Sequence, residues 1–199
     1  QHRLGTERMA IKRVDGRLLA QDLIAPIDLP AFDNSRMDGF ALRHADLVAD
    51  GDSELRIASA QFAGPALDMV VRQGECMRIT TGAPIPSGAD TVVIKENVRE
   101  RAGLLTVPSG VQAGADIRRA GEDVRTGEVV LRAGSLLTPA RISLAAALGM
   151  ADLEVSRRPT VAVFTAGDEL VEPGLTLAAG QVYNSNRELL MGLLRAEGL

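Results

Sequence analysis

The pattern of apolar and polar residues divides the chain into stretches of different character. Between residues 40 and 111, short apolar runs rich in β-branched residues alternate with turn clusters. Several short strands at this spacing are typical of a small β-barrel or sandwich. The best strands of this stretch are expected at residues 55–58, 76–80, 91–94 and 104–107. The turn clusters between them contain glycine beside aspartate, glutamate or arginine, which favours breaks in the strands.

A helix is predicted to follow this β-rich stretch. Thr138 suits the N-cap position, Pro139 the first helical position and Gly149 the C-cap. One face of the predicted helix is apolar and consists of Ile142, Leu144, Ala145 and Leu148. We expect this helix to pack against the N-terminal segment, where residues 6–30 contain short strand and helix pieces. The β-rich stretch would then be an insertion.

The last 41 residues change character again. Residues 159–165 are apolar at successive positions, which predicts a strand buried on both faces. Residues 185–188 have a capping-box pattern, and the leucines that follow have helical spacing. A buried strand, a glycine-containing loop and an amphipathic helix form the start of an open α/β sheet. One such unit cannot bury its own faces.

Taken together, these patterns predict a mixed α+β, multi-domain fold. A small β-rich barrel or sandwich lobe is inserted in an α/β lobe, and the start of an open α/β domain follows. The expected boundaries are 1–39 with 112–158 for a discontinuous N-terminal and linker lobe, 40–111 for the inserted lobe, and 159–199 for the incomplete α/β domain.

Composition narrows the class of protein. Apolar residues make up 46% of the chain, but aromatic residues only 3%, so the cores must consist of aliphatic side chains. A net charge of -4 without a basic run argues against nucleic-acid binding. The single Cys76 excludes an internal disulfide, and with two distant histidines it makes a zinc site unexpected. No apolar run approaches the roughly 20 residues that span a bilayer. We therefore expect a cytoplasmic protein without a membrane partner.

A polar turn cluster at residues 32–42 is the first candidate for chemistry. Gly39 after Asp38 permits a sharp reversal that leaves the carboxylate at the lip of a turn. An isolated Asp-Gly pair is more often a simple hairpin turn. Here Asn34, Ser35 and Arg36 add donors that a spacer does not need, and this composition suits a ligand site.

Other loops offer further candidates. In residues 80–86, two threonine hydroxyls and exposed backbone N–H groups could hold an oxyanion, although a rigid connector between strands is an equally good interpretation. Asp168 and Glu169 follow the predicted buried strand, where ligands of open α/β sheets bind. They could also be a turn former and a charge at a helix start. Asp123 and Arg118 would ordinarily be solvated surface charges.

Four motifs in order resemble those of the molybdopterin molybdenumtransferases, the MoeA and gephyrin E-domain family. They are residues 32–41, 78–90, 117–123 and 167–170, so the resemblance covers nearly the whole chain. Since the chain opens at Gln1 and closes directly after a predicted helix, we expect it to be truncated at both ends. The fragment alone is expected to be inactive, because the α/β unit is incomplete.

The resemblance implies an enzyme that inserts molybdate into adenylylated molybdopterin and releases AMP. It implies catalytic roles for Asp38, Thr81 and Glu169. The substrate-binding residues would be Ser35, Thr80, Gly82, Arg118, Asp123 and Asp168. Arg118 matches an anion-contacting arginine of the family, and its planar guanidinium suits phosphate or molybdate.

Electrostatics adds a metal ion to this expectation. A carboxylate about 5 Å from a phosphate or molybdate repels it by roughly 3 kcal/mol at an effective dielectric constant near 20. A divalent cation between the carboxylate and the oxyanion would turn this repulsion into attraction. Ligation by oxygen atoms alone favours Mg²⁺. We expect Asp38 and Glu169 to be its ligands.

The expected partners are a second copy of the chain, the small-molecule substrates and, as a candidate, the molybdopterin adenylyltransferase. Family members bring their lobes together across a two-fold axis, so the resemblance implies a homodimer with a composite site. Two alternatives remain open: a gephyrin-like scaffold or dimerisation module, and a molybdopterin-binding module without transferase activity.

Overall fold

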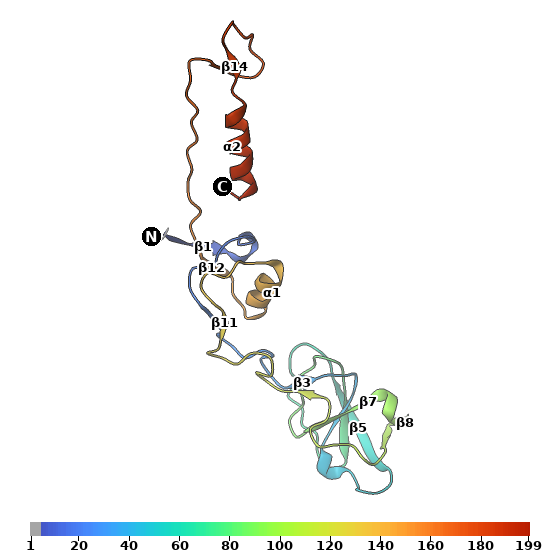
Figure 1. Cartoon of the computed structure of the whole chain (residues 1–199). Coiled ribbons are helices and arrows are strands. Elements are labelled where there is room, and N and C mark those ends of the chain that lie inside the picture. Colours follow the sequence, from blue (N-terminus) through green and yellow to red (C-terminus); the bar gives the residue numbers. More distant parts are fainter. Residues whose placement is uncertain (1–4) are drawn as a thin grey trace.

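The computed structural model describes residues 5–199, and its fold is mixed α/β and mostly β. Figure 1 shows an elongated molecule with three successive parts: a lobe that contains β3, β5, β7 and β8, a middle part around β1, β12 and α1, and an end with β14 and α2.

The lobe at one end is organised by a six-stranded sheet with the strand order β7-β4-β6-β5-β9-β8. Its pairs are antiparallel except for β5 and β6, and a register shift in β5 accompanies the curl of the sheet into a half-barrel. The strands are β4 (Gly39–Leu42), β5 (Ser53–Gln61), β6 (Glu75–Ile79), β7 (Thr91–Ile94), β8 (Arg99–Arg101) and β9 (Leu104–Val107). The four predicted strands of this stretch are thus confirmed, to within a few residues at their ends.

Burial explains why β4 lies inside the sheet. All four of its residues are buried, and it pairs with β6 on one side and β7 on the other. Phe40 and Leu42 pack into one cluster with Leu55 and Leu105, whereas Ala41 packs with Ile79 on the opposite face. The sequence showed this strand only as the apolar run after the turn cluster.

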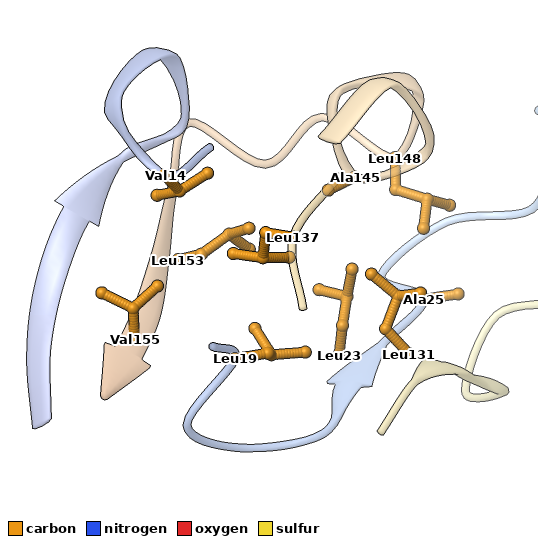
Figure 2. Packing of buried hydrophobic residues seen from close by; sticks show 10 residues of the cluster. All are labelled: Val14, Leu19, Leu23, Ala25, Leu131, Leu137, Ala145, Leu148, Leu153 and Val155. Atoms are coloured by element: carbon orange, nitrogen blue, oxygen red, sulfur yellow. The ribbon is translucent and has the colours of Figure 1, made fainter. Parts of the chain in front are cut away.

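The middle part joins residues that are far apart in the sequence. Strand β1 (Thr6–Ala10) pairs with β12 (Asp152–Ser156), and β2 (Leu23–Ile24) pairs with β11 (Val129–Leu131). Helix α1 (Pro139–Ala147) lies beside them. Figure 2 shows the aliphatic core that these segments share. It consists of Val14, Leu19, Leu23, Ala25, Leu131, Leu137, Ala145, Leu148, Leu153 and Val155.

The predicted helix in this part is confirmed, with one difference at its start. Pro139 occupies the first turn, and Gly149 follows the helix with a positive φ of 79°. Thr138 has the extended backbone of an N-cap residue, but its side chain makes no capping hydrogen bond. Proline lacks an N–H group, so one donor of the first turn is already absent.

A short two-stranded ribbon belongs to the same lobe as the six-stranded sheet. In it β3 (Asn34–Ser35) pairs with β10 (Ile117–Arg118), and Asn34 lies opposite Arg118. Two remote parts of the sequence, both of them motifs of the family resemblance, therefore meet at this ribbon.

The C-terminal part contains the parallel pair β13 (Leu170–Val171) and β14 (Val182–Tyr183), and helix α2 (Ser185–Ala196). The predicted helix is confirmed, but its N-cap is Asn184, whose side-chain oxygen accepts a hydrogen bond from the N–H of Arg187, rather than Ser185. The capping box was therefore placed one residue too late. Asn184 also donates to the hydroxyl of Thr165 over 2.7 Å, which ties the helix start to the preceding segment.

The buried strand predicted at residues 159–165 is wrong for this structure. These residues form no strand, and the side chains of Val161 and Phe164 are 46% and 86% exposed. A parallel strand needs neighbours on its edges and layers on its faces. Within the described residues no strand pairs with this segment, so its apolar composition has nothing to pack against.

The helices in residues 5–199 are all too short or too polar to cross a membrane.

Cys76 provides a chemical test of the lobe. Its side chain is fully buried in β6, and this burial raises the pKa of the thiol to about 12. We expect the native protein to resist a thiol reagent at about pH 8, where a free cysteine is partly ionised, and to react once it is unfolded. Equal labelling rates of the folded and the denatured protein would contradict the packing of this sheet.

Candidate functional site

The Asp38 carboxylate is held at the start of β4 by a threonine from the loop that follows the neighbouring strand β6. Because β4 and β6 are antiparallel and Gly39 lies opposite Ile79, Asp38 comes next to the residues that follow β6. Its Oδ1 accepts hydrogen bonds from the N–H of Thr81 over 2.9 Å and from the hydroxyl of Thr81 over 3.0 Å. Asp38 is therefore more than a turn former that bonds its own loop, since its partner lies 43 residues away.

A lysine approaches Asp38 from the other side of β4. Gly39 lies opposite Ile94 of β7, so Lys95 emerges directly beside Asp38. The N–H of Lys95 donates to the carbonyl oxygen of Asp38 over 3.1 Å, and its Nζ lies 3.3 Å from Oδ2. Lys95 was not predicted as a site residue from the sequence. Its one signal was a cation directly after a predicted strand, which gains meaning only when the register of β4 and β7 is known.

These contacts favour the ionised form of Asp38. The N–H of Thr81, then its hydroxyl, and then Lys95 lower the pKa of this carboxyl from its ordinary value. A depressed pKa means that the contacts stabilise the fold above the pKa of the unfolded chain, and that this contribution is lost as the pH falls through the folded pKa. At neutral pH Asp38 is a fixed negative charge.

Removal of the lysine charge tests this arrangement. In Lys95→Met we expect the pKa of Asp38 to rise towards its ordinary value without reaching it, because both donors of Thr81 remain. The measurement is an acid titration of the side-chain carboxyl followed by carbon NMR. An identical titration curve in wild type and variant would show that Lys95 does not act on Asp38.

A cavity of about 390 Å³ lies next to this cluster. The β3–β10 ribbon, the loop after β6 and the loop after β10 enclose it. Its lining residues are Asn34, Ser35, Arg36, Thr81, Gly82, Arg118, Glu122 and Asp123. Thr81 thus contacts both the Asp38 carboxylate and the cavity. A larger hollow of about 440 Å³ beside β7 has one charged lining residue, Asp116, and so offers an oxyanion no cation.

Ion pairs surround the cavity. Arg118 pairs with Asp123, which raises the pKa of its guanidinium further. Arg36 lies 2.6 Å from Glu122, and this contact, followed by the N–H of Arg119, lowers the pKa of the Glu122 carboxyl. All four side chains are substantially exposed, so each pair contributes little to stability. Their effect is to hold two guanidinium groups at the rim of the cavity.

The remaining predicted residues of this region have distinct positions. Ser35 is buried, and its hydroxyl donates to the carbonyl oxygen of Met37 over 2.6 Å. Gly82 has a φ of 78°, a conformation that glycine adopts without strain, and its N–H donates to the Ser35 carbonyl. The hydroxyl of Thr80 accepts a hydrogen bond from the N–H of Ala63, and Thr80 does not line the cavity.

Asp168 and Glu169 lie in a different part of the molecule. They directly precede β13, which pairs with β14. In Figure 1, β14 is at the opposite end of the molecule from β3 and β7. Asp38 and Glu169 therefore do not meet within one chain.

The donor set of one chain does not fit Mg²⁺. Both carboxylate oxygens of Asp38 already have partners in Thr81 and Lys95. In the part of the chain that the structure describes, no three acidic, histidine or cysteine side chains are grouped as metal ligands. Any Mg²⁺ site that uses Asp38 needs ligands from elsewhere.

Comparisons with known proteins agree on one family. Residues 2–149 match a family model described as the MoeA N-terminal region (domain I and II). The molybdopterin molybdenumtransferase of Haemophilus influenzae is 40% identical over 196 residues, which cover 96% of this chain and 48% of that protein. Molybdopterin molybdenumtransferase 2 of Mycobacterium tuberculosis is 39% identical over 191 residues, with 94% and 47% covered.

Solved structures show the same similarity. A crystal structure of the molybdopterin biosynthesis MoeA protein from Pyrococcus horikoshii has a TM-score of 0.86 and 32% sequence identity, and the match covers 96% of this chain and 52% of that one. The chain thus spans about half the length of the relatives that it matches.

Proposed function

Since the chain belongs to the MoeA family of molybdenum cofactor biosynthesis, we propose that the whole protein inserts molybdenum from molybdate into adenylylated molybdopterin and releases AMP. The observation that carries the proposal is the Asp38–Thr81–Lys95 cluster beside a cavity with arginines at its rim. Both molybdate and the pyrophosphate group of the adenylylated pterin are oxyanions, and arginine binds such groups through charge-assisted hydrogen bonds.

The proposed contribution of this chain is to bind and orient anions. Arg118 would exchange part of its contact with Asp123 for an oxyanion, and Thr81, whose hydroxyl proton is bonded to Asp38, would shape the adjoining wall of the cavity. Asp38 would fix Thr81 and Lys95 in place through its ionised carboxylate. We assign none of these residues as a nucleophile. Ser35, Thr80 and Gly82 would shape the loop that faces the substrate.

Completion of the site is proposed to need a second chain. Asp38 and Glu169 lie at opposite ends of one protomer, so a homodimer that brings the ends of two protomers together would unite them. Asp168 would then contribute to substrate binding from the partner. Such an assembly could add ligands for Mg²⁺ at Asp38, and no step of the proposal relies on the metal.

The remaining assignments follow from the same proposal. Residues 1–39 with 112–158 would form one lobe, 40–111 an inserted lobe, and 159–199 the beginning of an open α/β domain for molybdopterin. Residues 1–4 of the first lobe lie outside the described residues. A cytoplasmic location and an encounter with the molybdopterin adenylyltransferase belong to the proposal as well.

The test is an assay of molybdate-dependent AMP release with the complete gene product and adenylylated molybdopterin. The proposal expects repeated turnover that stops when molybdate is omitted. Binding of the pterin without release of AMP would instead identify a non-catalytic binding module. Absence of both, in a protein that still dimerises, would favour a scaffold.

The 199-residue chain by itself is expected to show no turnover in this assay. The reason is that the segment around Val161 and Phe164 has no strand to pair with among the described residues, so the α/β unit next to Glu169 is incomplete. The measurement compares AMP released by the chain and by the complete gene product at equal concentration. Multiple turnovers by the chain alone would contradict this expectation.

A further inference from the structure

Arg36 lines the same cavity as Arg118. In the β3–β10 ribbon Ser35 lies opposite Ile117 and Asn34 opposite Arg118, so Arg36 continues β3 directly beside the β10 strand. The N–H of Arg36 donates to the carbonyl oxygen of Asp116 over 2.9 Å, which fixes its backbone. Both arginine side chains line the cavity, and they are 46% and 40% exposed.

Each guanidinium group has donors to spare. Arg36 uses one Nη for Glu122 and its Nε for a long, 3.4 Å contact with the carbonyl oxygen of Ile117. Arg118 uses one Nη for Asp123. Within residues 5–199 the second Nη of either arginine makes no hydrogen bond. A guanidinium carries five N–H donors, so both groups can bind an oxyanion while they keep their carboxylate partners.

The charges of the cavity rim balance. Arg36 and Arg118 supply two positive charges, and Glu122 and Asp123 supply two negative ones. One arginine between two carboxylates would leave a dianion facing a net negative rim. With the second arginine the rim is neutral, so it does not repel a dianion through a net negative charge. Two planar guanidinium groups on the two strands of one ribbon can bind a tetrahedral oxyanion from two sides.

We propose that Arg36 is a second oxyanion-binding residue, which together with Arg118 holds a dianion of the molybdate and phosphate class in this cavity. The inference rests on the proposed function only for the identity of the natural oxyanion. The binding itself follows from the two guanidinium groups at the cavity.

The experiment titrates the 199-residue chain with sodium molybdate, and separately with inorganic phosphate, while proton–nitrogen NMR spectra record the arginine Nε–H signals. We expect saturable shifts of both Arg36 and Arg118. Arg36→Gln should weaken molybdate binding by about tenfold or more, since a charge-assisted contact is lost. Arg36→Lys should recover part of the affinity, because it keeps the charge but not the planar fork.

Two further variants separate binding from a structural effect on the loop. Arg119→Gln breaks a neighbouring ion pair with Asp33 outside the cavity lining, and affinity should be unchanged. Glu122→Gln breaks the ion pair of Arg36 but keeps the arginine, and binding should be equal or tighter because a repelling charge is gone. Should Arg36 act only by holding the loop, Glu122→Gln would weaken binding as much as Arg36→Gln does.

The inference is overturned by any of three results: molybdate fails to bind, the shifts are confined to Arg118, or Arg36→Gln binds like wild type. The outcome is separable from that of the AMP assay. Oxyanion binding by the 199-residue chain that depends on Arg36, when the complete gene product releases no AMP, would refute the proposed function and leave the binding site standing. AMP release by the complete gene product, together with unchanged oxyanion affinity in Arg36→Gln, would support the proposed function and overturn the inference about Arg36.

Discussion

Asp38→Asn is expected to lower AMP release by the complete gene product by about ten- to a hundredfold, because the variant loses a charge-assisted contact of the site. The asparagine oxygen can still accept the two hydrogen bonds from Thr81, so the turn and the fold should survive. The amide is neutral, however, and Lys95 loses its counter-ion. The measurement is the thermal midpoint and the rate of AMP release at several Mg²⁺ concentrations.

Asp28→Asn is the matched control. Asp28 accepts hydrogen bonds from both the N–H and the hydroxyl of Thr126, each over 2.8 Å, and therefore repeats the local contacts of Asp38 away from the cavity. Its pKa is also lowered, mainly by the N–H of Thr126. Full activity is expected for this variant. If Asp38→Asn also kept the wild-type rate and midpoint, Asp38 would be a structural turn residue and its catalytic assignment would fail.

The second large effect is expected for Gly39→Ala, which should destabilise the six-stranded lobe by about 3 kcal/mol or more, at the upper end for overpacked sites. A Cβ atom at this position would lie 1.9 Å from the carbonyl oxygen of Val93 and 3.2 Å from the Cα of Ile94. Strand β4 is buried and paired on both sides, so it cannot move away without breaking a ladder. The close approach of β4 and β7 at Gly39 also places Lys95 beside Asp38.

Chemical denaturation measures this effect, and labelling of Cys76 in the adjacent β6 reports on the lobe itself. Gly192→Ala serves as the control, because this glycine lies in α2 and has open space where the Cβ would be. There the substitution should be neutral or stabilising by up to about 1 kcal/mol. An unchanged midpoint and a protected Cys76 in Gly39→Ala would contradict the strand packing.

The sequence predicted those elements whose pattern is local. Strands such as β7 and β9 have continuous β-branched or aliphatic runs between turn residues, and α1 and α2 have caps and a helical apolar face. The segment 159–165 has an equally strong apolar pattern but forms no strand, because strand formation depends on partners that a local pattern does not contain.

The site was only partly predictable for the same reason. Motifs identified Asp38, Thr81 and Arg118, but their contacts depend on strand register: β4 beside β6 and β7, and β3 beside β10. Lys95 was not singled out, and Arg36 was noted only as one donor of a polar turn, because nothing in their neighbouring residues shows what lies across the sheet or ribbon. The domain boundaries and the composite site stay predictions.

The most direct test of the central claim, a transferase site shared by two chains, is subunit complementation. Asp38→Asn and Glu169→Gln versions of the complete gene product are assayed for AMP release separately and after they have been unfolded and refolded together. If each site takes Asp38 from one chain and Glu169 from its partner, half of the sites in a mixed dimer are intact. An equal mixture then regains about a quarter of wild-type activity, compared with about a tenth or less for Asp38→Asn alone. A mixture that forms mixed dimers and stays as inactive as the separate variants would contradict the account.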